Sequence, residues 1–290
     1  MSHVQLQKPA PFLRRYVQFY LQRELRDRRS FVVQSVPARA APMFEFVFGE
    51  PIRIRYPGSS IEQKSPHGVV VGMLTRPHGE LRVQGPFCSF IIMFQPAGLS
   101  ALLSVDPGEL VNQDLDIGSV FGTRMTELEE RLALCDSFAS RVAIADAFLA
   151  RQMQESRTND YLSFAMDSIA ARNGRIRIAE LAANCGVSAR QFERSFSTRF
   201  GMRPKLYTRI VRFQSALDRK ARTCAKSWTD IAQDFGYHDQ MHMIHDFQEF
   251  TGTTPTDTLH TLETFFRQQL SAIRLATGKE ASTHLPRLVI

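Results

Sequence analysis

The feature that most constrains the fold is a motif that occurs twice in the second half of the chain, about fifty residues apart. Each copy combines an apolar residue and an alanine, a glycine, two further apolar residues about one helical turn apart, and a closing Gly-x-x-Pro. The first copy has these residues at Leu181, Ala182, Gly186, Phe192, Phe196 and 201–204. The second copy has them at Ile231, Ala232, Gly236, Met243, Phe247 and 252–255. An internal repeat of this kind predicts two similar structural units.

The residue types in each copy suit a helix-turn-helix. A small alanine lets two helices cross closely, and glycine fits a turn in which φ is positive. Ser188 is suited to cap the second helix of the first copy. Ser227 and Asp230 have the spacing of a capping box at the start of the second copy. A single copy would be weak evidence, because helical hairpins in protein cores share the pattern, but two matched copies favour a bipartite helix-turn-helix domain.

The segment between the two copies, residues 204–222, predicts one long helix. Its apolar stripe consists of Leu206, Ile210, Phe213 and Leu217, and its basic residues lie off that stripe. A stiff helix of this length would fix the distance between two recognition helices. Entry into successive major grooves on one face of DNA requires a separation of about 34 Å.

Charge is distributed unevenly along the chain. Residues 1–160 are close to neutral, with 18 basic and 17 acidic side chains. Residues 161–226 hold 14 basic and 4 acidic side chains, whereas residues 227–260 hold 6 acidic side chains and no Lys or Arg. The basic block is the natural place for a polyanion such as DNA, although on charge alone a solvated helix face explains it equally well.

The first half predicts β-structure. Apolar residues alternate along 44–48 and 52–56, and β-prone runs at 68–72 and 87–95 are separated by proline and glycine. We expect a helix over 11–29 to precede these strands.

After Pro96 the apolar residues recur every three to four positions, which predicts helices over 123–135 and 137–154. The polar stretch 154–160 is the expected linker.

These patterns together predict an α+β protein. Its β-rich N-terminal domain would be a small barrel or sandwich, followed by a helical linker and an all-α domain of two helix-turn-helix units joined by a long helix. The expected limits are 1–120 for an effector or dimerisation domain, 121–160 for the linker helices, 161–265 for the DNA-binding domain and 266–290 for a helix end and tail.

Composition argues against several other classes of protein. No apolar run approaches the ~18 residues of a membrane span, and residues 1–10 lack the apolar run of a signal peptide, so we expect a cytoplasmic protein. The cysteines are widely separated, without a C-x-x-C pair, at Cys88, Cys135, Cys185 and Cys224. No phosphate-binding loop or Ser-His-Asp arrangement occurs. His242 and His245 have no further ligand nearby in the sequence. We therefore expect no enzyme activity, no cofactor and no metal site.

Residues from about 165 to 262 resemble the DNA-binding domain of AraC/XylS-family transcription regulators. The resemblance rests on the repeat together with Ile178, Ala179, Glu180, Val187, Ser188, Arg212, Ala216, Tyr237, Asp239 and Gln240. In the first half, residues 72–77 and the pattern Phe94-x-Pro96-x-Gly98 are similar to an uncharacterised domain that often precedes this unit. That second resemblance implies no ligand.

The family resemblance implies which side chains face DNA. In the first unit these are Ser188, Ala189, Arg190, Glu193 and Arg194. In the second unit they are Gln240, Met241, His242 and His245. Arg209 and Arg212 of the connecting helix are expected to contact phosphate.

The second unit departs from the family pattern. Relatives usually carry a small polar residue at the position of Met241, an aromatic residue at Met243 and an arginine at His245. The segment of the second unit is also acidic. Together these features predict that the first unit anchors the protein, while the second discriminates between sequences or docks only conditionally.

The resemblance implies a sequence-specific DNA-binding transcription regulator, and it favours activation through contact with RNA polymerase over repression. The N-terminal domain would sense a small-molecule effector or form a homodimer, and the sequence identifies no effector-binding residue. The alternative is a DNA-targeted enzyme such as an alkylation-response protein with an AraC-like domain. That enzyme needs a reactive cysteine in a metal-ligand cluster or methyl-acceptor motif, and the isolated Cys88 and Cys135 argue against it.

An apolar stripe in the linker helices consists of Leu128, Leu132, Val142 and Leu149. We expect it to form part of a dimer interface, and packing of both helices on their own sheet is equally compatible with the pattern.

Overall fold

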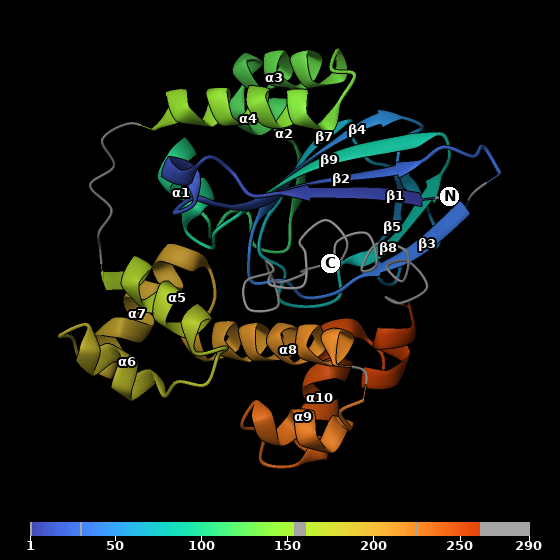
Figure 1. Cartoon of the computed structure of the whole chain (residues 1–290). Coiled ribbons are helices and arrows are strands. Elements are labelled where there is room, and N and C mark those ends of the chain that lie inside the picture. Colours follow the sequence, from blue (N-terminus) through green and yellow to red (C-terminus); the bar gives the residue numbers. More distant parts are fainter. Residues whose placement is uncertain (1, 30, 154–160, 224, 262–290) are drawn as a thin grey trace.

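The structure, a computed structural model, describes residues 2–29, 31–153, 161–223 and 225–261 (Figure 1). It confirms the α+β class, because the described strands all end by Asp116 and the regular elements described after that point are all helices. The expected linker 154–160 and the tail 266–290 lie outside the described residues.

The β-rich domain consists of two antiparallel sheets. The strands are β1 (Ser2–Gln7), β2 (Val17–Leu25), β3 (Phe31–Val36), β4 (Met43–Gly49), β5 (Arg53–Arg55), β6 (Gln63–Lys64), β7 (Gly68–Val71), β8 (Gly79–Gln84), β9 (Phe87–Phe94) and β10 (Asp114–Asp116). The larger sheet has the order β1-β2-β9-β4-β7-β10 and the smaller one β3-β8-β5-β6. Val47 and Phe87 of the larger sheet pack with Val32 and Val83 of the smaller one, so the inner faces of the two sheets share a core.

The prediction of a helix over 11–29 is wrong. Only Pro11–Leu13 form a short 3-10 turn, and β2 then pairs with both β1 and β9. Polar residues on this strand are buried: Arg23 forms an ion pair with Glu45, and the side-chain oxygen of Gln22 accepts a hydrogen bond from Arg141 at 2.8 Å. Because both faces of the strand are covered, the polar–apolar alternation that marks a half-exposed strand is missing.

Helices cover the outer face of the larger sheet. They are α1 (Gly98–Leu103), α2 (Ile117–Phe121), α3 (Thr123–Ala133) and α4 (Phe138–Gln152). The linker stripe Leu128, Leu132, Val142 and Leu149 is at most 2% exposed and packs with the phenylalanines of β4 and β9. The stripe therefore packs on the sheet of its own chain, and the prediction that it supplies a dimer interface is wrong.

The second half contains a succession of helices. They are α5 (Tyr161–Ala171), α6 (Ile178–Asn184), α7 (Ala189–Phe200), α8 (Pro204–Arg222), α9 (Trp228–Asp234) and α10 (Gln240–Thr251). Residues 255–261 are also helical. Among the helices that the structure describes, none has the length and apolar character needed to cross a membrane.

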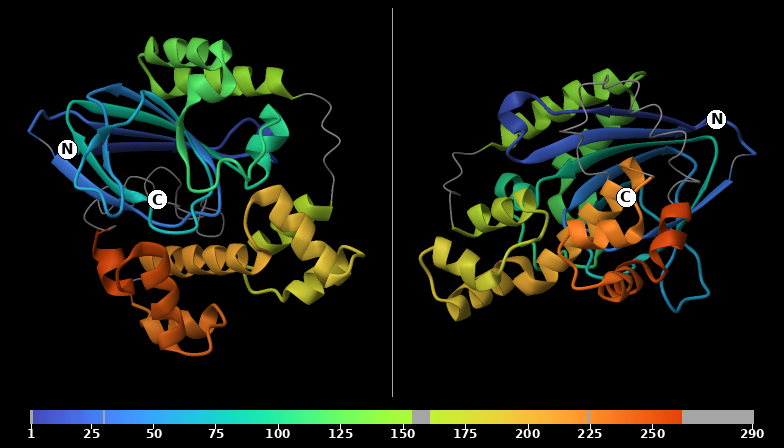
Figure 2. Two further views of the ribbon diagram at one scale, coloured as in Figure 1. Left: turned by 180° about the vertical axis from the view of Figure 1, so that it is seen from behind. Right: turned by 60° about the horizontal axis from the view of Figure 1, so that its bottom comes forward.

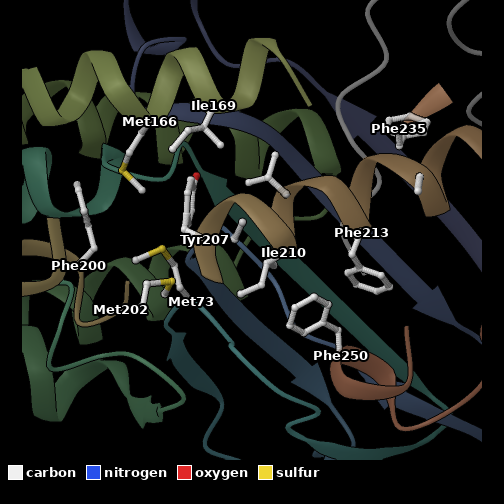
Figure 3. Close-up of a cluster of buried hydrophobic side chains, with 14 of the residues drawn as sticks. Met73, Met166, Ile169, Phe200, Met202, Tyr207, Ile210, Phe213, Phe235 and Phe250 are labelled. Atoms are coloured by element: carbon white, nitrogen blue, oxygen red, sulfur yellow. The ribbon is translucent and has the colours of Figure 1, made fainter. Parts of the chain in front are cut away.

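The long helix α8 organises this half of the molecule. In Figures 1 and 2 the β-rich domain lies along one side of α8, while α6–α7 and α9–α10 lie toward its two ends. Phe196 of the first unit packs on Tyr207. Phe250 of the second unit packs on Phe213 (Figure 3). Both units therefore share one core along α8, and Met73 of the β-rich domain belongs to the same core.

Candidate nucleic-acid interface

Helices α6 and α7 form the first helix-turn-helix. Gly186 lies in the turn with φ of +70°, a conformation that side chains rarely adopt. The hydroxyl of Ser188 accepts a hydrogen bond from the backbone N–H of Gln191 at 3.2 Å and caps α7. Phe192, Phe196 and Phe200 are buried on one face of α7. The opposite face of α7 is therefore directed outward.

The residues predicted to read DNA in the first unit lie together on that outward face. Ser188, Ala189, Arg190, Glu193 and Arg194 are all exposed. A groove of about 640 Å³ is lined by Ser188, Arg190, Gln191, Glu193, Arg194, Ser197 and Arg203. It is a polar surface with three arginines, as expected for contact with an anionic backbone and with base edges.

Three residues of this groove were missed by the sequence analysis: Gln191, Ser197 and Arg203. Helical spacing could have identified Ser197, because it lies one turn beyond Glu193 and Arg194. Arg203 carries no such signal. It lies outside α7, as the cap residue before α8, and only the fold brings it to the groove.

Helices α9 and α10 form the second helix-turn-helix. The predicted capping box is confirmed: Ser227 accepts from the backbone of Asp230, and the Asp230 carboxylate accepts from the backbone of Ser227. Gly236 takes the turn with φ of +67°. The Asp239 carboxylate accepts a hydrogen bond from the backbone N–H of His242 at 2.7 Å. This hydrogen bond, and to a smaller extent one with the His238 side chain, lowers the pKa of Asp239.

The residues predicted to read DNA in the second unit are also exposed. Gln240, Met241, His242 and His245 lie on the outward face of α10, while Met243 and Phe247 are buried. Met241 is 62% exposed, which is unusual for a large apolar side chain. Thr229 donates a hydrogen bond to the side-chain oxygen of Gln240 at 3.0 Å and so holds the first residue of α10 against α9.

The two arginines predicted to contact phosphate lie at the contact between α8 and α10. Arg209 donates to one carboxylate oxygen of Asp246 from Nε at 3.0 Å and from Nη2 at 2.7 Å. It also donates to Glu249, at 2.5 and 3.2 Å. Arg212 reaches the other oxygen of Asp246 at 3.4 Å. Asp246 is only 1% exposed, so this carboxylate is the buried centre of the cluster.

Aromatic rings enclose the same cluster. The guanidinium of Arg209 lies 5.0 Å from the ring centre of Phe250, and that of Arg212 lies 4.4 Å from the ring centre of Tyr237. Burial alone would lower the pKa of Arg209, but hydrogen bonds to Glu249 and Asp246 raise it above the ordinary arginine value. Both arginines therefore bind α10 to α8, and the structure does not bring them to the exposed reading faces.

Within the ranges that the structure covers, there is no group of three or more His, Cys, Asp or Glu side chains arranged to hold a metal ion.

Two family models match the sequence. A helix-turn-helix domain matches residues 181–261, and a domain of unknown function, DUF6597, matches residues 5–116. No curated protein matches the sequence of this chain.

Among solved structures, the chain is similar to ToxT from Vibrio cholerae. A 1.65 Å structure of ToxT has 10% sequence identity and a TM-score of 0.44, with 90% of this chain and 98% of that chain covered. A structure of ToxT with a bound unsaturated fatty acid has 9% identity and a TM-score of 0.43, with 90% and 95% covered. The fatty acid is a ligand of ToxT.

The match over 181–261 coincides with the repeat, the two glycine turns and the two outward faces. The chain therefore carries a C-terminal helix-turn-helix domain of the AraC type, preceded by a domain of unknown function.

Proposed function

We propose that the protein is a sequence-specific transcription regulator that reads two adjacent DNA half-sites. One observation carries this proposal: two recognition helices, α7 and α10, are fixed to a single helix and each exposes a row of polar or basic side chains. A 19-residue α8 is about 28 Å long, which is comparable to one turn of DNA.

The exposed side chains suggest how bases are read. Arg190 and Arg194 are one turn apart, and each can donate to O6 and N7 of guanine. Glu193 can accept from a cytosine amine. In the second unit, Gln240 suits adenine, and the exposed Met241 suits the methyl group of thymine.

We extend the proposal to activation through RNA polymerase, to a homodimer and to a location in the cytoplasm, where the DNA would be bound. The N-terminal domain would sense a small-molecule effector or mediate the homodimer. The homodimer must use a surface other than the linker stripe, since that stripe is buried within one chain.

The enzyme alternative is disfavoured by the environment of Cys88 and Cys185. Burial raises the pKa of the Cys88 thiol to about 11, so the thiolate that acts as a nucleophile is scarce. Burial also raises the pKa of Cys185. The helix-turn-helix match likewise points to a regulator rather than an enzyme.

Selection of binding sites from random DNA, followed by titration of variants, tests this function. Arg194→Ala is expected to cost roughly 1–3 kcal/mol on the selected site and to relax preference at one base pair. Arg199→Ala is the matched control, because Arg199 is an exposed arginine of the same helix outside the groove. Equal losses for Arg194→Ala on selected and random DNA would exclude base reading by Arg194.

A further inference from the structure

The β-rich domain contacts the connecting helix α8 and the second recognition helix α10 through the segment that joins β3 to β4. We call residues 37–41 of this segment the strap. The N–H of Ala38 donates to the carbonyl of Phe250, near the end of α10, at 2.8 Å. The carbonyl of Ala38 accepts from the side-chain amide of Gln214, on α8, at 3.4 Å. The oxygen of that amide accepts from the N–H of Ala40 at 3.2 Å. The peptide groups of one residue, Ala38, thus join α10 to α8.

The side chains of the strap alternate between the two domains. Ala38 and Ala40 are buried in the core of the helical domain, and their small size lets the strap backbone approach α8. Arg39 between them is also buried, but its Nε donates to the carbonyl of Ala41 at 2.9 Å. The backbone N–H and carbonyl of Arg39 both pair with Leu74 of the β-rich domain at 2.8 Å. The strap is therefore held from both sides.

Two further contacts involve the last turns of the recognition helices. Gly201 ends α7, and a Cβ atom placed on it would lie 2.7 Å from the Cα of Gly108 in the β-rich domain. Gly252 ends α10, and a Cβ placed there would lie 3.9 Å from the ring of Pro77. The β-rich domain thus touches both recognition helices at their C-terminal ends. Met73 adds an apolar contact, beside Met202 (Figure 3).

These contacts leave the reading residues free. Each recognition helix has 12 residues and is about 18 Å long. The reading residues lie at the cap residue Ser188 or within the first six positions of each helix, 189–194 and 240–245, and they are exposed. The β-rich domain contacts the opposite ends, so its contact with α7 and α10 is compatible with both helices lying in DNA. This arrangement suits positioning of the helices better than blocking of their reading faces.

We propose that the strap is a positioning element of the second DNA-reading unit, and that Gln214 is its positioning residue. By tying the end of α10 to α8, the strap fixes the direction of the second recognition helix relative to the first. The β-rich domain would thereby set the half-site spacing that the protein accepts. This inference rests on the proposed function, because it presupposes that both units read DNA.

The test measures binding of the full-length chain to a series of operators in which the distance between the two selected half-sites changes by single base pairs. One base pair rotates the second half-site by about one-tenth of a turn and shifts it by about 3.4 Å. Gln214→Leu keeps a buried side chain of similar size and removes both hydrogen bonds to the strap. Ser215→Ala is the matched control. The Ser215 hydroxyl is buried on the same helix and, within the described part of the chain, donates a hydrogen bond only to the carbonyl of Val211.

The wild-type protein and Ser215→Ala are expected to prefer the best spacing over its neighbours by about tenfold. For Gln214→Leu, that ratio is expected to fall to about two- to threefold, while binding to the first half-site alone is unchanged. Thermal unfolding of each variant, followed by circular dichroism, verifies that the compared proteins are folded.

Several results would overturn the inference. If Gln214→Leu loses affinity equally at every spacing, Gln214 only stabilises the fold. If it binds more tightly at every spacing, the contact is inhibitory. If the wild-type protein selects a site but accepts all spacings equally, the strap does not set spacing. Absence of any selected site would instead reject the proposed function, and the inference with it.

Hydrogen exchange of the wild-type protein gives a readout that does not depend on the variant folding. The amides of Ala38 and Ala40 are expected to exchange more slowly on the best operator than on one whose spacing differs by one base pair. Equal protection on both operators would contradict a role for the strap in spacing.

Discussion

The two helix-turn-helix units use the same local construction but expose different chemistry. Each has a glycine with positive φ in its turn and a side-chain cap on its recognition helix, Ser188 in the first unit and Asp239 in the second. The first unit exposes arginines beside a polar groove. The second exposes an amide, a methionine and two histidines. The repeat therefore conserves what builds the fold and varies what can touch DNA.

Charge differs between the units less than the sequence blocks indicate. Residues 227–260 contain only acidic charges, yet three of these carboxylates pair with cations of the basic block: Asp246 and Glu249 with Arg209, and Asp234 with Lys226. Because Arg209 is paired in this way, its charge is not available to attract DNA. Charge counted along the chain thus overstates both the repulsion of DNA by the second unit and the attraction by α8.

The largest expected effect comes from scrambling each half-site in turn. Scrambling the site of the first unit is expected to reduce affinity to the non-specific level, by about a thousandfold. Scrambling the site of the second unit is expected to cost about tenfold, because its reading face carries no Lys or Arg. Footprinting on the intact operator and on the two operators with one scrambled half-site measures both losses of affinity. Equal losses would show that the second unit binds as firmly as the first.

The buried Asp246 is expected to matter for stability more than any exposed acidic residue of the second unit. Asp246→Asn leaves two arginines without their shared carboxylate and is expected to lower the free energy of unfolding by about 2–3 kcal/mol. This value is below that of a fully buried pair because both arginines are partly exposed. Glu249→Gln, at the half-exposed partner, is expected to cost less than about 1 kcal/mol. Urea unfolding would contradict the prediction if the two losses were equal.

A smaller effect separates the arginines that can meet phosphate from those held inside the fold. Arg203 is exposed and lines the groove beside α7. Arg203→Ala is expected to weaken binding to all sequences alike and to lower the slope of log affinity against log salt by about one. Arg209→Ala is expected to leave that slope unchanged and to reduce stability, since Arg209 pairs with Asp246. Salt titrations of both variants show which of the two arginines contacts phosphate. A lower slope for Arg209→Ala would show that Arg209 also contacts phosphate.

The smallest expected effect is a pH dependence confined to the second half-site. Lowering the pH from about 8 to about 6 protonates histidine side chains and adds positive charge beside phosphate. The hydrogen bonds that lower the pKa of Asp239 keep its carboxylate negative across this range, so it does not contribute to the change. The cost of scrambling the second half-site is expected to rise about two- to threefold at the lower pH. In a double variant, His242→Gln with His245→Gln, the cost of scrambling the second half-site should no longer change with pH. If the pH dependence persists in this variant, other residues cause it.

Sequence reasoning worked best where structure is decided locally. The turn glycines, the capping box at Ser227 and the strands at 44–48 and 87–95 were all predictable, because each depends on residues within a few positions of one another. It was wrong for β2, whose polar side chains Gln22 and Arg23 are buried and paired with residues of other elements. The spacing of apolar residues could not reveal that strand, because burial on both faces removes the period of two.

Within the candidate site, too, some residues could be predicted from local sequence and others could not. The exposed reading residues of α7 and α10 follow from helical spacing alone, since caps and turns fix which face of a helix is buried. Arg203 could not be placed in the groove by its position in the sequence, because it lies outside the recognition helix.

By itself, the sequence determined that this chain has two helix-turn-helix units on a long helix, and which faces of those units point outward. Tertiary structure alone decided the partners of Arg209 and Asp246 and the contact between the domains. Arg209 and Asp246 are 37 residues apart, and Ala40 and Gln214 are 174 residues apart. Local preferences act over one or two turns of chain, whereas ion pairs and hydrogen bonds between elements depend on how the whole chain packs.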